Sequence, residues 1–176
     1  MDNFKKALLV IFTLQFANAY AEVNFDITGM KIGDQLTEEF RYSNCPAKDK
    51  GKPEVTCSRF IELGGGRVFV SYYFDEFKLI GAALSFKPDL FNDVLAAYTQ
   101  KFDEEPESIK EEEVVTRAGV TYLNQIVAWE TTSGKFEVSK YGSSISHGSA
   151  VIHSPEFVNY TKKKRAERQK ELADKL

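Results

Sequence analysis

A serine-rich stretch followed by a histidine is the part of this chain whose residue types could perform nucleophilic chemistry. Residues 142–147 read G-S-S-I-S-H and would offer the hydroxyls of Ser143 and Ser144 beside the imidazole of His147. The nucleophile elbow of hydrolases needs G-x-S-x-G between a strand and a helix, whereas this stretch lacks the second glycine and is expected between two strands. We therefore predict that the chain is not an enzyme, with a hydrolase using the turn from Ser143 to His147 as the alternative.

The remaining groups that could bind a metal or a cofactor have unsuitable spacing. His147 and His153 lie six residues apart, which is not a metal-ligand spacing. Glu104, Glu105 and Glu107 lack the apolar neighbours that would raise a carboxyl pKa for glycoside hydrolysis. The glycines at 64–66 precede no helix that could hold a phosphate. No cofactor and no metal are expected, and the acidic residues at 103–113 are interpreted as a solvated connector.

Two cysteines, Cys45 and Cys57, complete the reactive groups of the chain. An even count in an exported protein predicts one disulfide, with two buried free thiols as the alternative. The bridge would close a loop of about a dozen residues and stabilise the fold by about 3 kcal/mol in the chain-entropy model.

The first 21 residues have the pattern of a secretory signal. Lys5 and Lys6 precede an apolar run at 7–16, and the small residues of A-N-A and A-Y-A allow cleavage after Ala19 or Ala21. A run of about ten apolar residues is too short to cross a bilayer, which needs about 20. The sequence therefore predicts a soluble periplasmic or secreted protein, with a single domain at 22–155 and a charged helical tail at 156–176.

The elements that must position these residues alternate between strands and a few helices. Alternating apolar side chains predict a hairpin over 67–86, with a polar break at 75–76, and further strands at 54–63, 112–117, 120–131, 135–141 and 149–154. In the second strand of the hairpin, Leu79, Gly81 and Ala83 are expected to share one face. Leu36 and Phe40 mark a short N-terminal helix. A stripe predicts the main core helix, with its N-cap at Asp89 and its apolar positions at Phe91, Val94, Leu95, Tyr98 and Phe102.

Hairpins outnumber crossovers in this order, so we predict an α+β fold. Its antiparallel sheet would have about six to seven strands, with the short helix and the core helix on one face and an exposed C-terminal helix.

Charge divides the chain into an acidic body and a basic end. Residues 161–176 contain seven Lys or Arg and three Asp or Glu. An acidic exported body excludes nucleic acid as the expected partner. The tail can fold back on the acidic residues at 104–113 or make weak contact with an anionic surface, and it is expected to add little to stability.

Aromatic residues are the candidates for binding. Tyr72, Tyr73 and Phe74 cluster in the hairpin, and Trp129 lies in a later strand. Aromatic side chains anchor protein interfaces, and they also fill sheet cores, so both roles remain open for these four residues.

Part of the chain resembles a known architecture. Residues 27–86 carry Gly29-Met30 with Gln35, the pair Cys45 and Cys57, and Tyr73-Phe74 followed by Lys78-Leu79. This pattern resembles one repeat of the secreted β-lactamase inhibitory proteins and, more distantly, the small outer-membrane assembly lipoproteins. The chain departs from those lipoproteins because it has no lipid-attachment cysteine, and no second cysteine pair follows.

The second half, from Lys101 through Pro106 to Trp129, looks like small exported bacterial and prophage proteins. These resemblances imply a non-catalytic protein that binds another envelope or exported protein, as an inhibitor, an immunity protein or an assembly accessory. A carbohydrate- or peptidoglycan-binding module is the second alternative.

Overall fold

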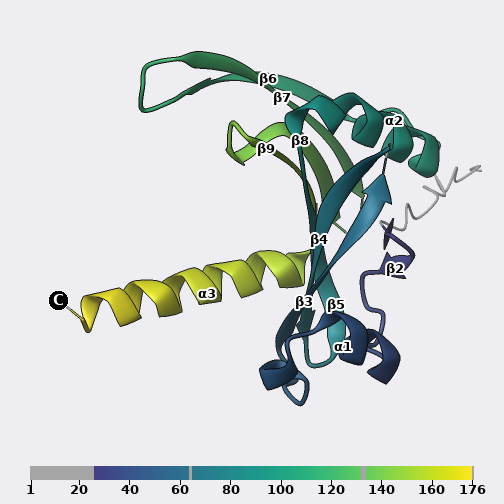
Figure 1. The fold of residues 1–176 in the computed structure, drawn as a ribbon, viewed down its shortest axis with the longest axis vertical. Helices are drawn as coiled ribbons and strands as arrows, with labels where there is room; N and C mark the ends of the chain where they lie inside the picture. Colours follow the sequence, from purple (N-terminus) through teal and green to yellow (C-terminus); the bar gives the residue numbers. More distant parts are fainter. Residues whose placement is uncertain (1–25, 64, 132–133, 176) are drawn as a thin grey trace, which may run out of the picture.

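One antiparallel sheet organises the molecule (Figure 1). The computed structural model describes residues 26–63, 65–131 and 134–175, and the predicted export signal at residues 1–21 lies outside them. Seven strands pair in the order β3-β4-β5-β9-β8-β7-β6. With three α-helices beside this sheet, the α+β prediction is confirmed.

The bounds of the elements follow the chain. The small two-stranded sheet and the strands of the main sheet are β1 (Asp26–Ile27), β2 (Met30–Lys31), β3 (Val55–Leu63), β4 (Gly66–Asp75), β5 (Lys78–Phe86), β6 (Ser108–Val115), β7 (Thr121–Thr131), β8 (Gly134–Ser144) and β9 (His147–His153). The helices are α1 (Glu38–Asn44), η1 (Ala47–Asp49), η2 (Pro88–Leu90), α2 (Phe91–Phe102) and α3 (Pro155–Ala173).

The main sheet is built from two similar halves. In each half a helix is followed by a meander of strands: α1 precedes β3, β4 and β5, and α2 precedes β6, β7, β8 and β9. The last strands of the two halves, β5 and β9, pair antiparallel in the middle of the sheet, from Gly81 opposite His153 to Phe86 opposite Gly148. We call this pairing the central seam.

The predicted hairpin at 67–86 is confirmed, with one correction to its second strand. Glu76 and Phe77 form the turn with φ values of 48° and 63°, a left-handed pair that suits the twist of a two-residue hairpin loop. The pairing then shifts between Tyr73 and Phe74, which leaves Ile80 as an extra residue. Leu79 therefore lies on the helix-covered side, and it does not share a face with Gly81 as the alternation predicted.

The predicted core stripe of α2 is buried against the second half of the sheet. Phe91, Val94, Tyr98 and Phe102 are buried, and the Tyr98 ring lies 4.5 Å from that of Phe136 in β8. The start of the helix differs from the prediction. Asp89 belongs to the 3-10 turn η2, and the N-cap is Leu90, which makes no side-chain capping bond.

The first half has its own helix and the disulfide. Thr37 caps α1 by accepting a hydrogen bond from the Phe40 N–H at 3.2 Å, and the Phe40 ring packs edge-on against Tyr72 at 5.1 Å. Cys45, the C-cap of α1, is bonded to Cys57 in β3, so the predicted disulfide is confirmed. This bridge fixes the end of a seven-residue helix that contains no buried residue.

The strands of the second half extend further than the sequence indicated. β6 begins at Ser108, four residues before the strand predicted at 112–117, so residues 108–111 of the expected connector lie in a strand. A strand that is exposed on both faces needs no apolar alternation, which explains why composition alone indicated a connector. β8 runs to Ser144 and β9 starts at His147, so the turn between them is shorter than predicted.

The C-terminal helix α3 runs away from the sheet and is the yellow helix of Figure 1. It is 19 residues long, and its buried residue is Phe157 in the first turn. Within the described part of the chain, no helix is both long and apolar enough to cross a membrane.

Candidate binding face

The face of the sheet opposite α1 and α2 carries three rows of side chains, which we call the open face. Register places one residue from each of β3, β4, β5 and β9 in every row. The rows are Phe60–Phe69–Ser85–Ser149, Ser58–Ser71–Ala83–Val151 and Thr56–Tyr73–Gly81–His153. The first two rows are made mostly of small side chains. The N-cap and first turns of α3, residues 154–161, lie on the third row, and we call them the root of α3.

Ser154 fixes the root of α3 at the central seam. Its buried hydroxyl donates to the carbonyl of Ile80 in β5 at 2.5 Å and accepts from the Phe157 N–H at 3.0 Å. The Phe157 ring covers Gly81, where a Cβ would come within 2.4 Å of the ring, and lies 4.7 Å from the ring of Tyr73. These contacts hold the first turns of α3 on the open face.

Beyond this root, residues 162–173 of α3 extend away from the sheet, and we call them the arm. Lys164 pairs with Glu54 at 2.5 Å and with Glu167 at 3.1 Å, and the pKa of its ammonium is raised by those two carboxylates. Every described residue after Lys164 is exposed, including Leu172. The arm turns away from the sheet (Figure 1) instead of folding back on residues 104–113, which the sequence allowed.

A groove of about 400 Å³ lies beside this root on the open face. Small side chains, those of Ser71, Ala83 and Ser85, line its floor, and Phe69 and Tyr73 stand at its sides. His147 and Ser149 line the end that β9 contributes. A trough with a small polar floor and aromatic sides suits an inserted side chain or an extended segment of a partner.

An exposed aromatic cluster adjoins this groove at the β3–β4 end of the open face. Phe60 and Phe69 are opposite each other in register with their rings 5.1 Å apart, and they are 55% and 36% exposed. The guanidinium of Arg67 lies 4.0 Å from the centre of the Phe60 ring. We call these three residues the Phe–Arg cluster. Phe and Arg are both enriched in protein interfaces.

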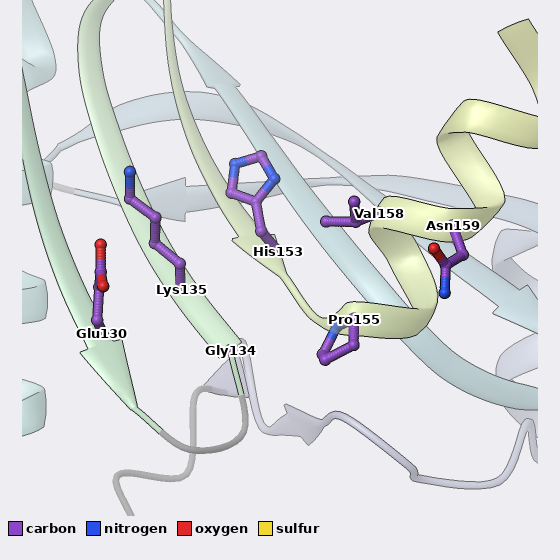
Figure 2. Close-up of a pocket in the computed structure, with 7 residues that line it drawn as sticks. All are labelled: Glu130, Gly134, Lys135, His153, Pro155, Val158 and Asn159. Carbon is purple, nitrogen blue, oxygen red and sulfur yellow. The ribbon is translucent and has the colours of Figure 1, made fainter.

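A second pocket, of about 490 Å³, lies between the root of α3 and the ends of β7 and β8 (Figure 2). Figure 2 shows the side chains of Lys135 and His153 next to each other, with Glu130 on one side and Val158 on the other. Burial lowers the pKa of His153, Glu137 opposes this shift, and Lys135 adds to it. The imidazole is therefore neutral at neutral pH, and this pocket presents a neutral histidine beside the Lys135–Glu137 ion pair at 2.7 Å.

The serine–histidine turn does bring a hydroxyl and an imidazole together. The Oγ of Ser144 lies 3.3 Å, and that of Ser146 2.9 Å, from Nδ1 of His147, and all three residues are exposed. Among the described residues, no hydrogen bond or ion pair joins His147 to a carboxylate. The side chain of Ser143 is not among the described side chains. The turn therefore shows two members of a catalytic triad but not the group that would orient the base.

Three of the four predicted binding residues are in the core. Tyr72, Phe74 and Trp129 are at most 1% exposed, on the side covered by the helices, so they cannot contact a partner in this fold. Tyr73 is on the open face and is half-buried beneath α3. The Phe–Arg cluster was missed, although the alternation of Phe69 with the buried Val68 and Val70 is a signal that could have found it.

No group of His, Cys, Asp or Glu in the described ranges is arranged to hold a metal ion. Comparison of the chain with protein-family models, with curated proteins and with solved structures finds no match in any of the three. The class of the protein is therefore defined by its own geometry: an α+β sheet with one helix-covered face and one open face that carries a projecting helix.

Proposed function

We propose that this chain is a non-catalytic exported protein that binds another envelope or exported protein through the open face. The observation that carries the proposal is the Phe–Arg cluster, an exposed group of interface-type side chains at the edge of the groove. Aromatic and arginine anchors next to a pocket are typical of the few residues that provide most of the binding energy in an interface. An inhibitor, an immunity protein and an assembly accessory all fit such a surface.

The absence of catalysis is part of the proposal. The hydroxyls of Ser144 and Ser146 and the ring of His147 lie on the surface, where water competes for every hydrogen bond. A general base needs an orienting partner and a site that excludes water, and both are missing from the described surroundings of this turn. We expect S144A and S146A, which do not line the groove, to leave the biological activity unchanged, and a hundredfold loss with the fold intact would contradict the proposal.

Export to the periplasm or the medium is supported by two observations. The N-terminal sequence has the signal pattern, and the bridge between Cys45 and Cys57 is a bond that persists in oxidising compartments. Intact-mass measurement of the purified protein should give a chain that begins at Tyr20 or Glu22. A chain that retains Met1 and remains in the cytoplasm would contradict this part of the proposal.

The binding test compares two surfaces on one protein. The tagged wild-type protein should retain a stoichiometric partner from a cell-envelope extract, and F60S/F69S should lower the affinity on the order of tenfold or more. Y42S is the matched control, because Tyr42 is 68% exposed and lies on α1, on the other side of the sheet. Equal binding by wild type and F60S/F69S would show that the open face is not the interface.

A carbohydrate-binding role has one observation in its favour. Phe69 and Tyr73 flank the groove, and Ser71 and Ser85 add hydroxyl groups between them, a combination that could stack and hydrogen-bond a sugar. Sedimentation with purified peptidoglycan separates the two roles. Sedimentation that F69S abolishes, with no protein partner retained, would favour the carbohydrate module.

A further inference from the structure

The hairpin of β6 and β7 extends past the rest of the sheet. β7 pairs with β6 from Thr121 to Ala128, whereas it pairs with β8 only from Ile126 to Thr131. Asn124 and Tyr122 still contact β8, through the Tyr141 N–H at 2.8 Å and the Tyr141 ring at 5.6 Å. Beyond these contacts the hairpin is a two-stranded ribbon, and Figure 1 shows it reaching beyond the β8–β9 turn. Two-stranded ribbons are marginally stable in water unless something packs against them or pairs with them.

β6 is an edge strand with an unpaired side. It is the last strand in the order of the sheet, and among the described residues only β7 pairs with it. Six of its eight residues are exposed, and it contains no proline and no bulge, so its protection against unspecific pairing is limited to its charged side chains, Lys110 and the glutamates at 111–113. The outer row of backbone N–H and C=O groups is thus available to a further strand.

Exposed apolar side chains accompany this edge. Ile109 and Val115 of β6 are 61% and 62% exposed, and Leu123 of β7 is 55% exposed. Register and alternation put these three side chains on the same face of the ribbon. An added strand would bury part of this apolar surface in addition to satisfying the backbone groups.

The charges of β6 determine which strand can pair there. Glu111, Glu112 and Glu113 occupy its middle, and Glu111 and Glu113 share the face of Ile109 and Val115. Antiparallel pairing of two β6 strands centred on Glu112 would put Glu111 opposite Glu113 and Glu112 opposite Glu112 of a second copy, which is unfavourable. Lys or Arg opposite them is favourable, so the edge favours a basic strand over its own copy, in which only Lys110 can face a glutamate.

We propose that β6 is a docking edge for an extended basic segment of a partner protein, which adds to the sheet as a further strand. The partner segment carries Lys or Arg opposite Glu111 and Glu113, with apolar residues flanking them. Main-chain hydrogen bonds provide the attachment, and the glutamates provide the selection. This edge is separate from the open face, so the inference is independent of the binding role proposed above.

The test uses synthetic strands and the exported protein. The probe is a peptide of about eight residues whose alternate positions on one face are valine, lysine, lysine and valine, with threonine on the other face, long enough to span a strand. One control peptide replaces lysine with glutamate, and another keeps the lysines but carries N-methyl groups on alternate amides, so that it retains the charge and cannot pair. Nuclear magnetic resonance titration follows the amides of β6, and hydrogen exchange measures their protection.

We expect the basic peptide to slow exchange of the β6 amides, and both control peptides to leave it unchanged. E111K/E113K should weaken peptide binding on the order of tenfold. E104K/E105K is the matched control, because Glu104 and Glu105 are exposed glutamates in the loop before the strand, and it should bind like wild type. Circular dichroism confirms that both variants are folded.

Four results would overturn the proposal: no protection at millimolar peptide, equal binding of the N-methylated peptide, equal losses in the two charge variants, or self-association of the protein through β6.

Discussion

The ring of Phe157 in α3 packs directly against Gly81 in β5, where the glycine has no side chain that would hold the helix further away. A Cβ at Gly81 would come within 2.4 Å of Cγ and 2.6 Å of Cδ2 of that ring. The neighbouring Tyr73 ring, 4.7 Å away, limits how far Phe157 can move aside. The close approach of α3 to β5 therefore depends on the absence of a side chain at Gly81.

Replacing Gly81 with alanine should lower the free energy of unfolding by about 1–3 kcal/mol, the usual range for overpacking. Urea denaturation measures the change, and G51A is the control because a Cβ there has no neighbour within 4 Å. The combination G81A/F157A should lose less than the sum of the two single variants, because removing the ring removes the clash. Additive losses would show that the contact does not exist.

Two truncations should separate the root of α3 from its arm. Ending the chain after Thr161 keeps Phe157 and Tyr160, removes the exposed ion pair of Lys164 with Glu54, and should change stability by less than about 1 kcal/mol. Ending it after Pro155 also removes the buried Phe157 ring and should lower stability by about 3 kcal/mol or more.

This result would correct the expectation from the sequence that the whole tail adds little. Thermal unfolding followed by circular dichroism is the measurement. Equal melting points for the two truncated chains would mean that the root is not part of the folded unit.

Removing the disulfide should have a larger effect than removing the arm. C45S/C57S should lower stability by about 3 kcal/mol, because the bridge closes a loop of 12 residues and holds α1, whose side chains are at most partly buried. Thiol titration of the denatured wild-type protein should find no free cysteine. Two titratable thiols, or an unchanged stability in C45S/C57S, would contradict the prediction.

His153 should make the protein less stable in mild acid. Its folded-state pKa is lowered, first by burial, so the unfolded chain binds the proton more readily between that pKa and the usual value of about 6.5. Stability should therefore fall as the pH decreases through this window and should not fall further from this cause below it. The charge of Lys135 lowers the pKa of His153 further and should steepen the pH dependence of stability, whereas the charge of Glu137 opposes this shift and should flatten it. Glu130 also faces this pocket.

Urea midpoints at several pH values between 5 and 7.5 test the prediction. H153Q should flatten the pH dependence, and H147Q is the matched control at the exposed histidine. The chain has only these two histidines, so the comparison is complete. A slope that persists in H153Q would assign the effect to other groups.

The sequence predicts the covered half of this protein better than its surface. The stripe from Phe91 to Phe102 and the alternation from Val68 to Phe74 identify α2 and β4, because buried positions must be apolar at the period of their element. The same rule locates only the second half of β6, because its residues are exposed on both faces, and it misses the extra residue Ile80, which changes the phase within β5.

The candidate site is harder to predict for a related reason. Alternation shows that Phe69 and Tyr73 share a face, but not that α3 covers one of them and leaves the other at a groove. That outcome depends on Ser154 meeting the carbonyl of Ile80, a contact between residues 74 positions apart. Non-local contacts of this kind leave no periodic signal in the sequence.

The same contact has a consequence for the order of folding. The partners of the α3 root come from both halves of the chain, with Ile80 and Gly81 in the first half and Ser154 at the end of the second. Each half can form its meander from neighbouring strands, whereas Ser154 meets the carbonyl of Ile80 only where the end of β9 has reached β5 at the central seam. Contacts between distant parts of a chain form slowly because closing a long loop costs entropy. Docking of Phe157 on Gly81 therefore joins the two halves of the chain at one end of the seam, and its rate is tied to that long-range pairing.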